Sequence, residues 1–287
     1  MEFLRPTTLA EALALKAERP DAVPIAGGTD VMVELNFDHR RPEALLDLTT
    51  VPELTEWSTS DGTVRLCAGV PYSRVITELG ESVPALAMAS RTVGSPQIRN
   101  RGTVGGNLGA ASPAGDTHPV LLALDARVEV ASVRGTRLLR AEEFYVGVKR
   151  HALAEDELIT AVHLPGHAGP QQFAKVGTRN AMVIAVCSFA IALRQGEVGA
   201  AIGSAAPTPR RAPEAEDFLA TELPWGSSEA LPDSLKRRFG ELVGAAAQPI
   251  DDVRGSAAYR KHALGVLARR TLTWAWDEHR TGERACA

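Results

Sequence analysis

Two short turns built around paired glycines are the features of this sequence most able to do chemistry. Residues 26–30 are Ala-Gly-Gly-Thr-Asp, and residues 103–107 are Thr-Val-Gly-Gly-Asn. Glycine has no Cβ, so successive backbone N–H groups in such a turn can approach an anion closely. Two turns from separate parts of the chain suit the two phosphates of a dinucleotide. For each turn taken alone, the alternative is a tight turn in which glycine only supplies a positive φ.

The sequence excludes several other kinds of cofactor site by motif. Neither turn matches G-x-G-x-x-G or the P-loop, so a Rossmann protein or a P-loop NTPase is not indicated. Cys67, Cys187 and Cys286 lie far apart and form no C-x-x-C pair, whereas an iron–sulfur cluster needs about four thiolates. The seven histidines form no H-x-x-x-H pair on a plausible helix. Redox chemistry in this chain would therefore need an organic cofactor.

Composition indicates a soluble globular protein. The chain has 287 residues, enough for two domains of ordinary size, with 45% hydrophobic and 23% charged residues. Its net charge of −4 gives no reason to expect nucleic acid or an anionic membrane as partner. We see no transmembrane stretch and no basic region before an apolar core at the N-terminus, so we expect a cytoplasmic protein.

The first glycine turn lies inside a predicted strand–helix unit. Thr8 and Glu11 fit a capping box at the start of a helix over 9–19. Strands are predicted at 23–25 and 44–48, with a helix at 31–37 between them. This order implies a parallel pair with the glycine turn at the carboxyl end of a strand.

The second glycine turn lies in the most unusual stretch of the chain, residues 94–116. Its glycines, prolines and asparagines predict a long structured loop without helix or central strand, and such loops are usually functional. Around it we predict helices at 73–79, 83–92 and 118–124, and strands at 64–68, 127–131 and 158–164.

The pattern changes after about residue 171. Strands are predicted at 173–177, 183–193 and 198–204, followed by helices at 212–221, 229–247 and 256–280. Three strands followed by three helices form an α+β unit, so we place a domain boundary near 165–171.

Residues 93–108, Val-Gly-Ser-Pro-Gln-Ile-Arg-Asn-Arg-Gly-Thr-Val-Gly-Gly-Asn-Leu, resemble the central flavin signature of the molybdenum hydroxylases. The family includes xanthine dehydrogenase and carbon monoxide dehydrogenase, and the resemblance is to their medium, FAD-binding subunit. Residues 26–30, 111–116, 175–179 and 252–260 continue the likeness, which covers essentially the whole chain. Its long central motif is highly specific.

The resemblance implies an α+β protein with a two-part FAD-binding domain of the vanillyl-alcohol-oxidase type and a small α+β C-terminal domain. The first domain would span 1–168, with parts at about 1–55 and 56–168, and the second would span 169–280. The resemblance implies no catalytic side chain and no metal ligand on this chain. The residues it assigns to FAD are Pro24, Ile25, Ala26, Gly27, Gly28, Thr29, Asp30, Val31, Val93, Thr103, Val104, Gly105, Gly106, Asn107, Asp116, Ile159 and Lys175.

Some of these residues have a simpler structural explanation. Asp116, expected to bind cofactor hydroxyls, is also suited to cap the helix at His118. Lys175, expected near the flavin ring or phosphates, is also suited to be a solvated charge on a strand.

In the family, electrons from a molybdenum cofactor on a large subunit cross [2Fe–2S] clusters on a small subunit and reach FAD on the medium subunit. The resemblance therefore implies both partners, arranged as a dimer of heterotrimers, with NAD⁺ or another acceptor. It favours the xanthine dehydrogenase type. Carbon monoxide, aldehyde and aromatic-heterocycle dehydrogenases remain alternatives, as do a stand-alone flavin oxidase and a flavin-binding module.

Overall fold

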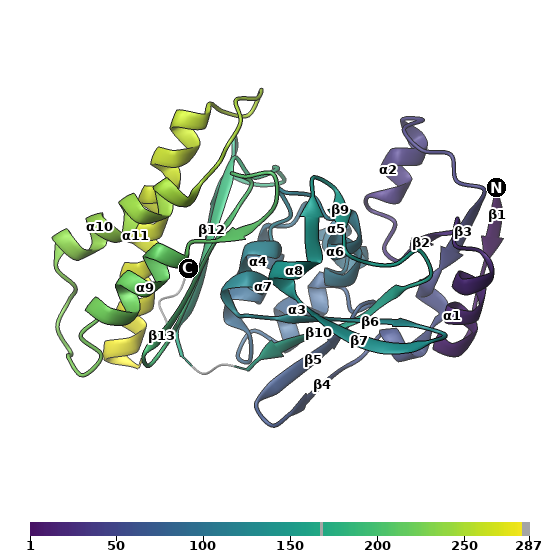
Figure 1. The fold of residues 1–287 in the computed structure, drawn as a ribbon, viewed down its shortest axis with the longest axis horizontal. Coiled ribbons are helices and arrows are strands. Elements are labelled where there is room, and N and C mark those ends of the chain that lie inside the picture. Colours follow the sequence, from purple (N-terminus) through teal and green to yellow (C-terminus); the bar gives the residue numbers. More distant parts are fainter. Residues whose placement is uncertain (167–168, 283–287) are drawn as a thin grey trace.

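The computed structural model describes residues 1–166 and 169–282 (Figure 1). Cys286 lies outside the described residues, as does part of the predicted boundary at 165–171. The described part contains four β-sheets, and helices cover them or connect their strands. No helix in this described part is both long and apolar enough to cross a bilayer.

The N-terminal lobe is built on a parallel three-stranded sheet. Its strands run in the order β1 (Glu2–Leu4), β3 (Ala44–Asp47) and β2 (Val23–Ile25). Helix α1 (Leu9–Glu18) begins as predicted, because Thr8 Oγ1 accepts the Glu11 backbone N–H at 3.1 Å. The predicted parallel pair is confirmed. The first glycine turn leaves β2 at its carboxyl end and leads into α2 (Val31–Asn36).

The central sheet is antiparallel, in the order β4 (Trp57–Ser60), β5 (Thr63–Cys67), β10 (Leu158–Pro165), β6 (Arg127–Ser132) and β7 (Gly135–Arg140). Alternate residues such as Val64 and Leu66 are fully buried, whereas Arg65 between them is partly exposed and pairs with Glu129. The apolar face packs in one core with α3 (Tyr72–Glu78), α4 (Pro84–Thr92) and α7 (His118–Ala123).

The C-terminal sheet separates two groups of helices (Figure 1). Its antiparallel strands are β11 (Gln171–Val176), β12 (Cys187–Arg194), β13 (Glu197–Gly203) and β14 (Arg210–Arg211). On β12, Phe189 and Ile191 join the core beneath α9 (Pro213–Glu222), α10 (Asp233–Ala246) and α11 (Ala257–Thr281). The intervening Ala190 and Ala192 join the central core that includes α4 and α7. Small residues on that face let the two cores approach each other closely.

Short elements that the sequence analysis did not predict complete the fold. They are β1, β4, β7 and β14, the 3₁₀ turns Leu48–Thr50 and Pro52–Leu54, helix α8 (Ala141–Phe144), and the ribbon of β8 (Tyr145–Gly147) and β9 (Arg150–His151). Strand β12 begins at Cys187 rather than at 183, because Lys175 Nζ holds the Val183 carbonyl in a loop at 3.1 Å.

The prediction of a helix-free loop over residues 94–116 was wrong. The segment contains α5 (Pro96–Arg101) and α6 (Val104–Ala110). Hydroxyl caps start both helices: Ser95 Oγ accepts the Ile98 N–H at 3.4 Å, and Thr103 Oγ1 accepts the Gly106 N–H at 2.9 Å. Tertiary packing has overridden the low helix propensity of glycine in α6.

Candidate flavin site

The two glycine turns lie against each other. A Cβ added at Gly27 would fall 1.9 Å from the carbonyl oxygen of Arg101, just before the second turn. A Cβ at Gly102 would lie 3.4 Å from Thr29 Oγ1 of the first turn. The absence of side chains at these glycines is therefore what lets two distant stretches of backbone meet.

The second turn is also pressed onto the central sheet. A Cβ at Gly105 would lie 2.5 Å from Ala68 Cβ, directly after β5. The Tyr72 backbone N–H donates to the Gly102 carbonyl at 3.0 Å, and Pro71 forms an isolated β-bridge with Thr103. These contacts fix the position and orientation of the start of α6 relative to the central sheet.

A cavity of about 1040 Å³ opens beside the paired turns, at the upper end of the range for small-molecule sites. Most of the sequence-predicted site residues line it. They are Pro24, Ala26, Gly27, Gly28, Thr29, Asp30, Val31, Val93, Thr103, Gly105, Gly106, Asn107, Asp116 and Ile159. Ile25, Val104 and Lys175 do not line this cavity.

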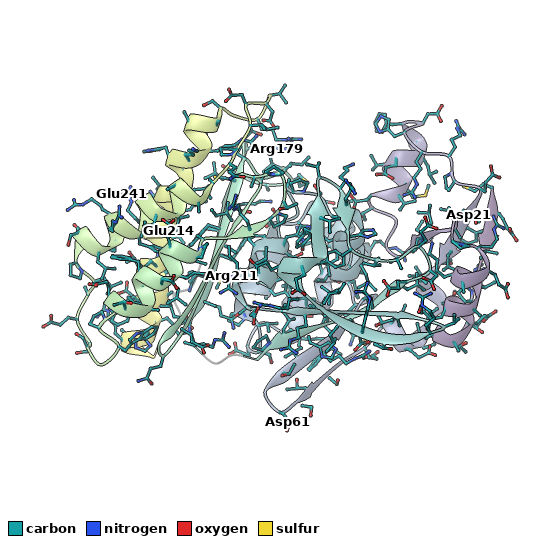
Figure 2. The ribbon with its side chains drawn as sticks, viewed as in Figure 1. Asp21, Asp61, Arg179, Arg211, Glu214 and Glu241 are labelled. Carbon is teal, nitrogen blue, oxygen red and sulfur yellow. The ribbon has the colours of Figure 1, made fainter. Side chains whose placement is uncertain are left out.

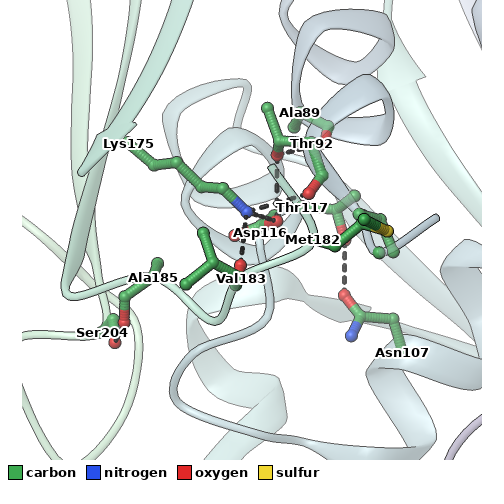
Figure 3. Close-up of polar contacts among 12 residues, drawn as sticks. Ala89, Thr92, Asn107, Asp116, Thr117, Lys175, Met182, Val183, Ala185 and Ser204 are labelled. Carbon is green, nitrogen blue, oxygen red and sulfur yellow. Dashed lines mark hydrogen bonds and ion pairs between the residues drawn. The ribbon is translucent and has the colours of Figure 1, made fainter. Parts of the chain in front are cut away.

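Lys175 instead reaches toward Asp116, Thr92 and Val183 (Figure 3). Its ammonium group, on β11, is nearly buried and lies 2.6 Å from Asp116 Oδ2. It also donates to the carbonyl of Thr92 at 2.9 Å and to that of Val183 at 3.1 Å. Its three protons thus have three partners, and the C-terminal sheet is tied to both α4 and the loop before α7.

The two carboxylate oxygens of Asp116 differ: one belongs to this network, and the other does not. Oδ2 accepts from Lys175 and from Thr92 Oγ1, the latter at 2.9 Å. Oδ1 is buried and has no hydrogen-bond partner among the described residues, although Asp116 lines the cavity. Burial raises the pKa of Asp116, and the adjacent Lys175 ammonium opposes that rise. The arrangement leaves an acceptor available to a donor from a bound molecule.

A second polar group near α6 is partly engaged. Asn107 Oδ1 accepts from Thr117 Oγ1 at 2.8 Å (Figure 3), which leaves its amide N–H₂ facing other partners. Asn107 lines the cavity two residues after Gly105. The site therefore presents donors and an acceptor close together.

Carboxylates outnumber cations among the residues that line the cavity. The carboxylates are Asp21, Asp30, Glu34, Asp116, Glu155 and Glu157; the cations are Lys16, Arg40 and Lys149. Burial also raises the pKa of Asp30. Lys16 already donates to the carbonyls of Pro20 and Ala22, at 2.7 and 2.8 Å. A bound diphosphate here would depend on backbone N–H groups rather than on a cluster of positive side chains.

A buried histidine lies beneath the loop that carries Asp116. His118 Nδ1 is 2.7 Å from the hydroxyl of Tyr145, and both side chains are buried. Burial lowers the pKa of His118 to about 3, so the imidazole is neutral at pH 7. A Cβ at Gly115 would lie 2.3 Å from His118 Nε2, so only glycine fits over this ring. His118 thus packs against Gly115, which lines the cavity, and is not itself among the lining residues.

Sequence reasoning missed three parts of the cavity wall. Tyr72 enters from the start of α3, and His151 and Leu153 come from the β8–β9 ribbon and the chain after it. The loop 182–184 brings Met182 and Ile184 from the C-terminal sheet, each 54% exposed. The apolar run in the sequence at this loop predicts a strand from 183, whereas β12 begins at Cys187.

The described residues contain no group of three or more His, Cys, Asp or Glu side chains arranged to hold a metal ion. The cavity instead has features that fit FAD. Two glycine turns bring backbone close to the cavity, an unpartnered carboxylate oxygen is available to a hydroxyl group, and the volume suits a large cofactor.

The fold and this site define a flavin-binding oxidoreductase subunit, and comparison with protein-family models agrees. Residues 1–167 match the FAD-binding domain in molybdopterin dehydrogenase, and residues 172–275 match the C-terminal domain of CO dehydrogenase flavoprotein. The chain belongs to the molybdenum hydroxylase family as a FAD-binding medium subunit. The resemblance stated from the sequence is therefore confirmed.

Full-length relatives include subunits of several enzymes. The nicotine 6-hydroxylase medium subunit of Paenarthrobacter nicotinovorans is 33% identical over 95% of this chain and 96% of its own. The xanthine dehydrogenase FAD-binding subunit of Escherichia coli is 30% identical over 94% of each chain. Among solved structures, quinoline 2-oxidoreductase from Pseudomonas putida 86 superposes with a TM-score of 0.89 at 27% identity, covering 98% of both chains. The Cu,Mo-CO dehydrogenase gives 0.88 at 27% identity, covering 96% of this chain and 97% of that one.

Proposed function

We propose that this chain holds FAD in the cavity beside its two glycine turns and passes electrons from a [2Fe–2S] partner subunit to an acceptor. The observation that carries the proposal is the meeting of the two turns at a cavity where Asp116 Oδ1 has no hydrogen-bond partner within residues 1–166 and 169–282. FAD accepts electrons singly or in pairs, so it can connect iron–sulfur clusters to a two-electron acceptor such as NAD⁺.

Each part of the cavity wall has a distinct role in this proposal. Backbone N–H groups at Gly28 and Gly105 approach the diphosphate, and Gly28 and Gly106 have no side chain to block that approach. The N–H of Gly106 itself donates to Thr103 Oγ1. Asp116 Oδ1 accepts a hydroxyl of the cofactor. Asn107 donates through its amide, and Val93 and Ile159 provide apolar contacts.

Lys175 acts in this proposal through Asp116. Its buried ammonium opposes the rise in the pKa of Asp116 that burial causes, and its contact with Oδ2 fixes the direction in which Oδ1 points. The residue is therefore a positioning residue, which modifies the expectation that it approaches the flavin directly.

The protein's proposed assembly follows the family resemblance. A molybdenum-cofactor large subunit and a [2Fe–2S] small subunit complete the enzyme, as a dimer of heterotrimers in the cytoplasm. The domains at 1–168 and 169–280 have different roles: the first surrounds most of the cofactor, and the second adds the 182–184 loop to the cavity wall and holds Asp116 through Lys175. No acid, base or nucleophile of this chain is needed for electron transfer.

We favour an organic substrate of the xanthine type, acted on by the large subunit. Support comes from the stretch 87–101 and from the relatives named as xanthine dehydrogenase subunits. A relative of similar likeness is named for nicotine, which makes a different aromatic nitrogen heterocycle the second candidate.

The site is tested by Asp116→Asn with measured FAD content and affinity. Lys175 and Thr92 both donate to the Oδ2 position, so the amide oxygen is held there and the N–H₂ group turns toward the cavity. A donor then faces the cofactor hydroxyl, and we expect FAD affinity to fall about tenfold or more. Thr117→Val, which removes the hydroxyl that donates to Asn107 but leaves Asp116 intact, should have the smaller effect.

The assembly is tested by co-expressing the chain with its two expected partners and recording the visible spectrum. Flavin together with iron–sulfur absorption, and NADH-dependent reduction of the flavin, support the proposal. A colourless chain in an otherwise assembled complex would exclude the cavity as a flavin site.

A further inference from the structure

The C-terminal helices carry a positively charged groove that shares no residue with the flavin cavity. It lies between α10 and α11 and encloses about 380 Å³. Both helices lie on the side of the C-terminal sheet opposite α4 and α7 (Figure 1). We call it the α10–α11 groove, lined by Asp233, Lys236, Arg237, Val266, Arg269, Arg270, Thr273 and Trp274.

A pair of glycines determines where the groove begins. A Cβ at Gly240 of α10 would lie 2.6 Å from the carbonyl oxygen of Gly265 of α11, so the helices touch through their backbones there. The groove follows, toward the start of α10 and the second half of α11. Its lining residues on α11 recur at i, i+3, i+4, i+7 and i+8, which is one face of a helix.

Most of the charge in this groove is uncompensated. Lys236 pairs with Asp233 at 2.7 Å, but Arg237, Arg269 and Arg270 form no ion pair among the described residues. Four cations thus face one carboxylate. By contrast, Arg65 of the central sheet pairs with Glu129, and Arg211 of the C-terminal sheet pairs with Glu216.

The groove is also partly apolar. Val266 is half-buried within it, and Trp274 is 36% exposed at its other end. Arginine and tryptophan are the residue types most enriched at energetically important positions of protein interfaces. A simple solvated helix face would not combine unpaired guanidinium groups with an exposed indole.

We propose that the α10–α11 groove binds an acidic segment of another protein chain that carries an aromatic or apolar side chain against Trp274. From Val266 to Trp274 the groove follows α11 for about 12 Å, the length of roughly four extended residues. Cations on both walls along this length match a linear series of carboxylates, which guanidinium groups bind through two parallel hydrogen bonds.

The test uses the full chain and a fluorescein-labelled peptide of about eight residues, made of glutamate and aspartate around one phenylalanine. Fluorescence anisotropy should show saturable binding that weakens strongly when NaCl is raised from about 50 to about 500 mM. The double variant Arg269→Ala/Arg270→Ala should bind about tenfold more weakly. Trp274→Ala should also weaken binding but should leave the salt dependence unchanged.

Arg238→Ala is the matched control. Arg238 lies on α10 next to Arg237, pairs with Glu241 outside the groove, and is exposed; Glu241 projects from the same helix in Figure 2. The affinity of the Arg238→Ala variant for the peptide should stay within about twofold of that of the unmodified chain.

Three outcomes would overturn the proposal. Non-saturable binding, or an equal loss with Arg238→Ala, would show only diffuse attraction to a basic surface. Displacement of the peptide by ADP or inorganic phosphate at equal concentration would assign the groove to a small polyanion. Thermal unfolding of each variant, measured in parallel, separates loss of binding from loss of fold.

Discussion

The two glycine turns look alike in sequence, yet they are built differently. In each, the first glycine is pressed against a neighbouring backbone: Gly27 against Arg101, and Gly105 against Ala68. The second glycines differ. Gly28 has a φ of +74°, which side-chain-bearing residues rarely adopt, whereas Gly106 is an ordinary helical residue of α6.

This difference shows at which positions the fold itself requires glycine and at which position only a bound cofactor could require it. Gly27 and Gly105 are required by packing, and Gly28 by backbone conformation. At Gly106 an added Cβ would meet only Thr103 Oγ1, at 3.1 Å, so no comparable structural need exists. If the second glycine of each turn contacts a bound diphosphate, a substitution at Gly106 should change cofactor binding with little change in stability.

The largest effect is expected when a methyl group is added to the first glycine of either turn. Gly27→Ala and Gly105→Ala should each lower the free energy of unfolding by about 3 kcal/mol, because backbone must move. Gly27→Ala should be the worse, since its Cβ would fall 1.9 Å from a carbonyl oxygen. Thermal or urea unfolding measures both. Gly226→Ala, with nothing within 4 Å, is the control and should be close to neutral.

A pH-dependent loss of stability is expected from the loop that follows the second turn, which has no counterpart after the first. The pKa of His118, beneath Gly115, is lowered by burial to about 3 in the folded chain, from a value of 6.5. The unfolded chain therefore binds a proton that the folded chain does not, as pH falls from 6.5 toward 3. This contribution to stability is complete above pH 6.5 and decreases by about 1.4 kcal/mol per pH unit below it.

The measurement for His118 is the free energy of unfolding at several pH values between 7 and 5. His118→Gln should be less stable at pH 7, because Tyr145 loses its partner, but its stability should depend less on pH. Parallel curves for the two proteins would contradict a buried neutral imidazole.

A smaller effect is expected at Gly28. Gly28→Ala should cost about 1 kcal/mol of stability, from the strain of a positive φ. Gly62→Ala provides a matched control, since Gly62 has a φ of +71°, open space around it and a place in the β4–β5 turn. Both variants should lose similar stability, but only Gly28→Ala should also lower FAD affinity. Equal flavin binding by the two would argue against the first turn as a phosphate site.

The smallest effect on folding is expected at Gly106. Gly106→Ala therefore separates FAD binding from stability most clearly. Alanine favours a helix over glycine by about 0.5–1 kcal/mol, which should offset the contact with Thr103. Stability should stay nearly unchanged while FAD affinity falls about tenfold, because a methyl group occupies the approach to the backbone N–H groups. Gly244→Ala in α10 is the helical control. Full flavin binding by Gly106→Ala would remove the second turn from the proposed clamp.

Much of the local structure could be predicted from the sequence because its signals are local. Thr8 and Glu11 set the start of α1, and alternating apolar residues marked β5. The prediction failed where packing decides, as in the segment 94–116. Its glycines suggested a loop, but contact between Gly105 and Ala68 makes glycine the residue that a helix at this place requires.

The candidate site divides in the same way. By itself, the sequence determined the two glycine turns, the family and the carboxylate at Asp116, because motifs depend on neighbouring residues. Only the tertiary structure decided that the turns touch, that Lys175 contacts Asp116 rather than lining the cavity, and that the loop 182–184 forms part of the cavity wall. Those relations join residues tens of positions apart, and the close packing of backbones that creates them leaves no periodic signal in either stretch.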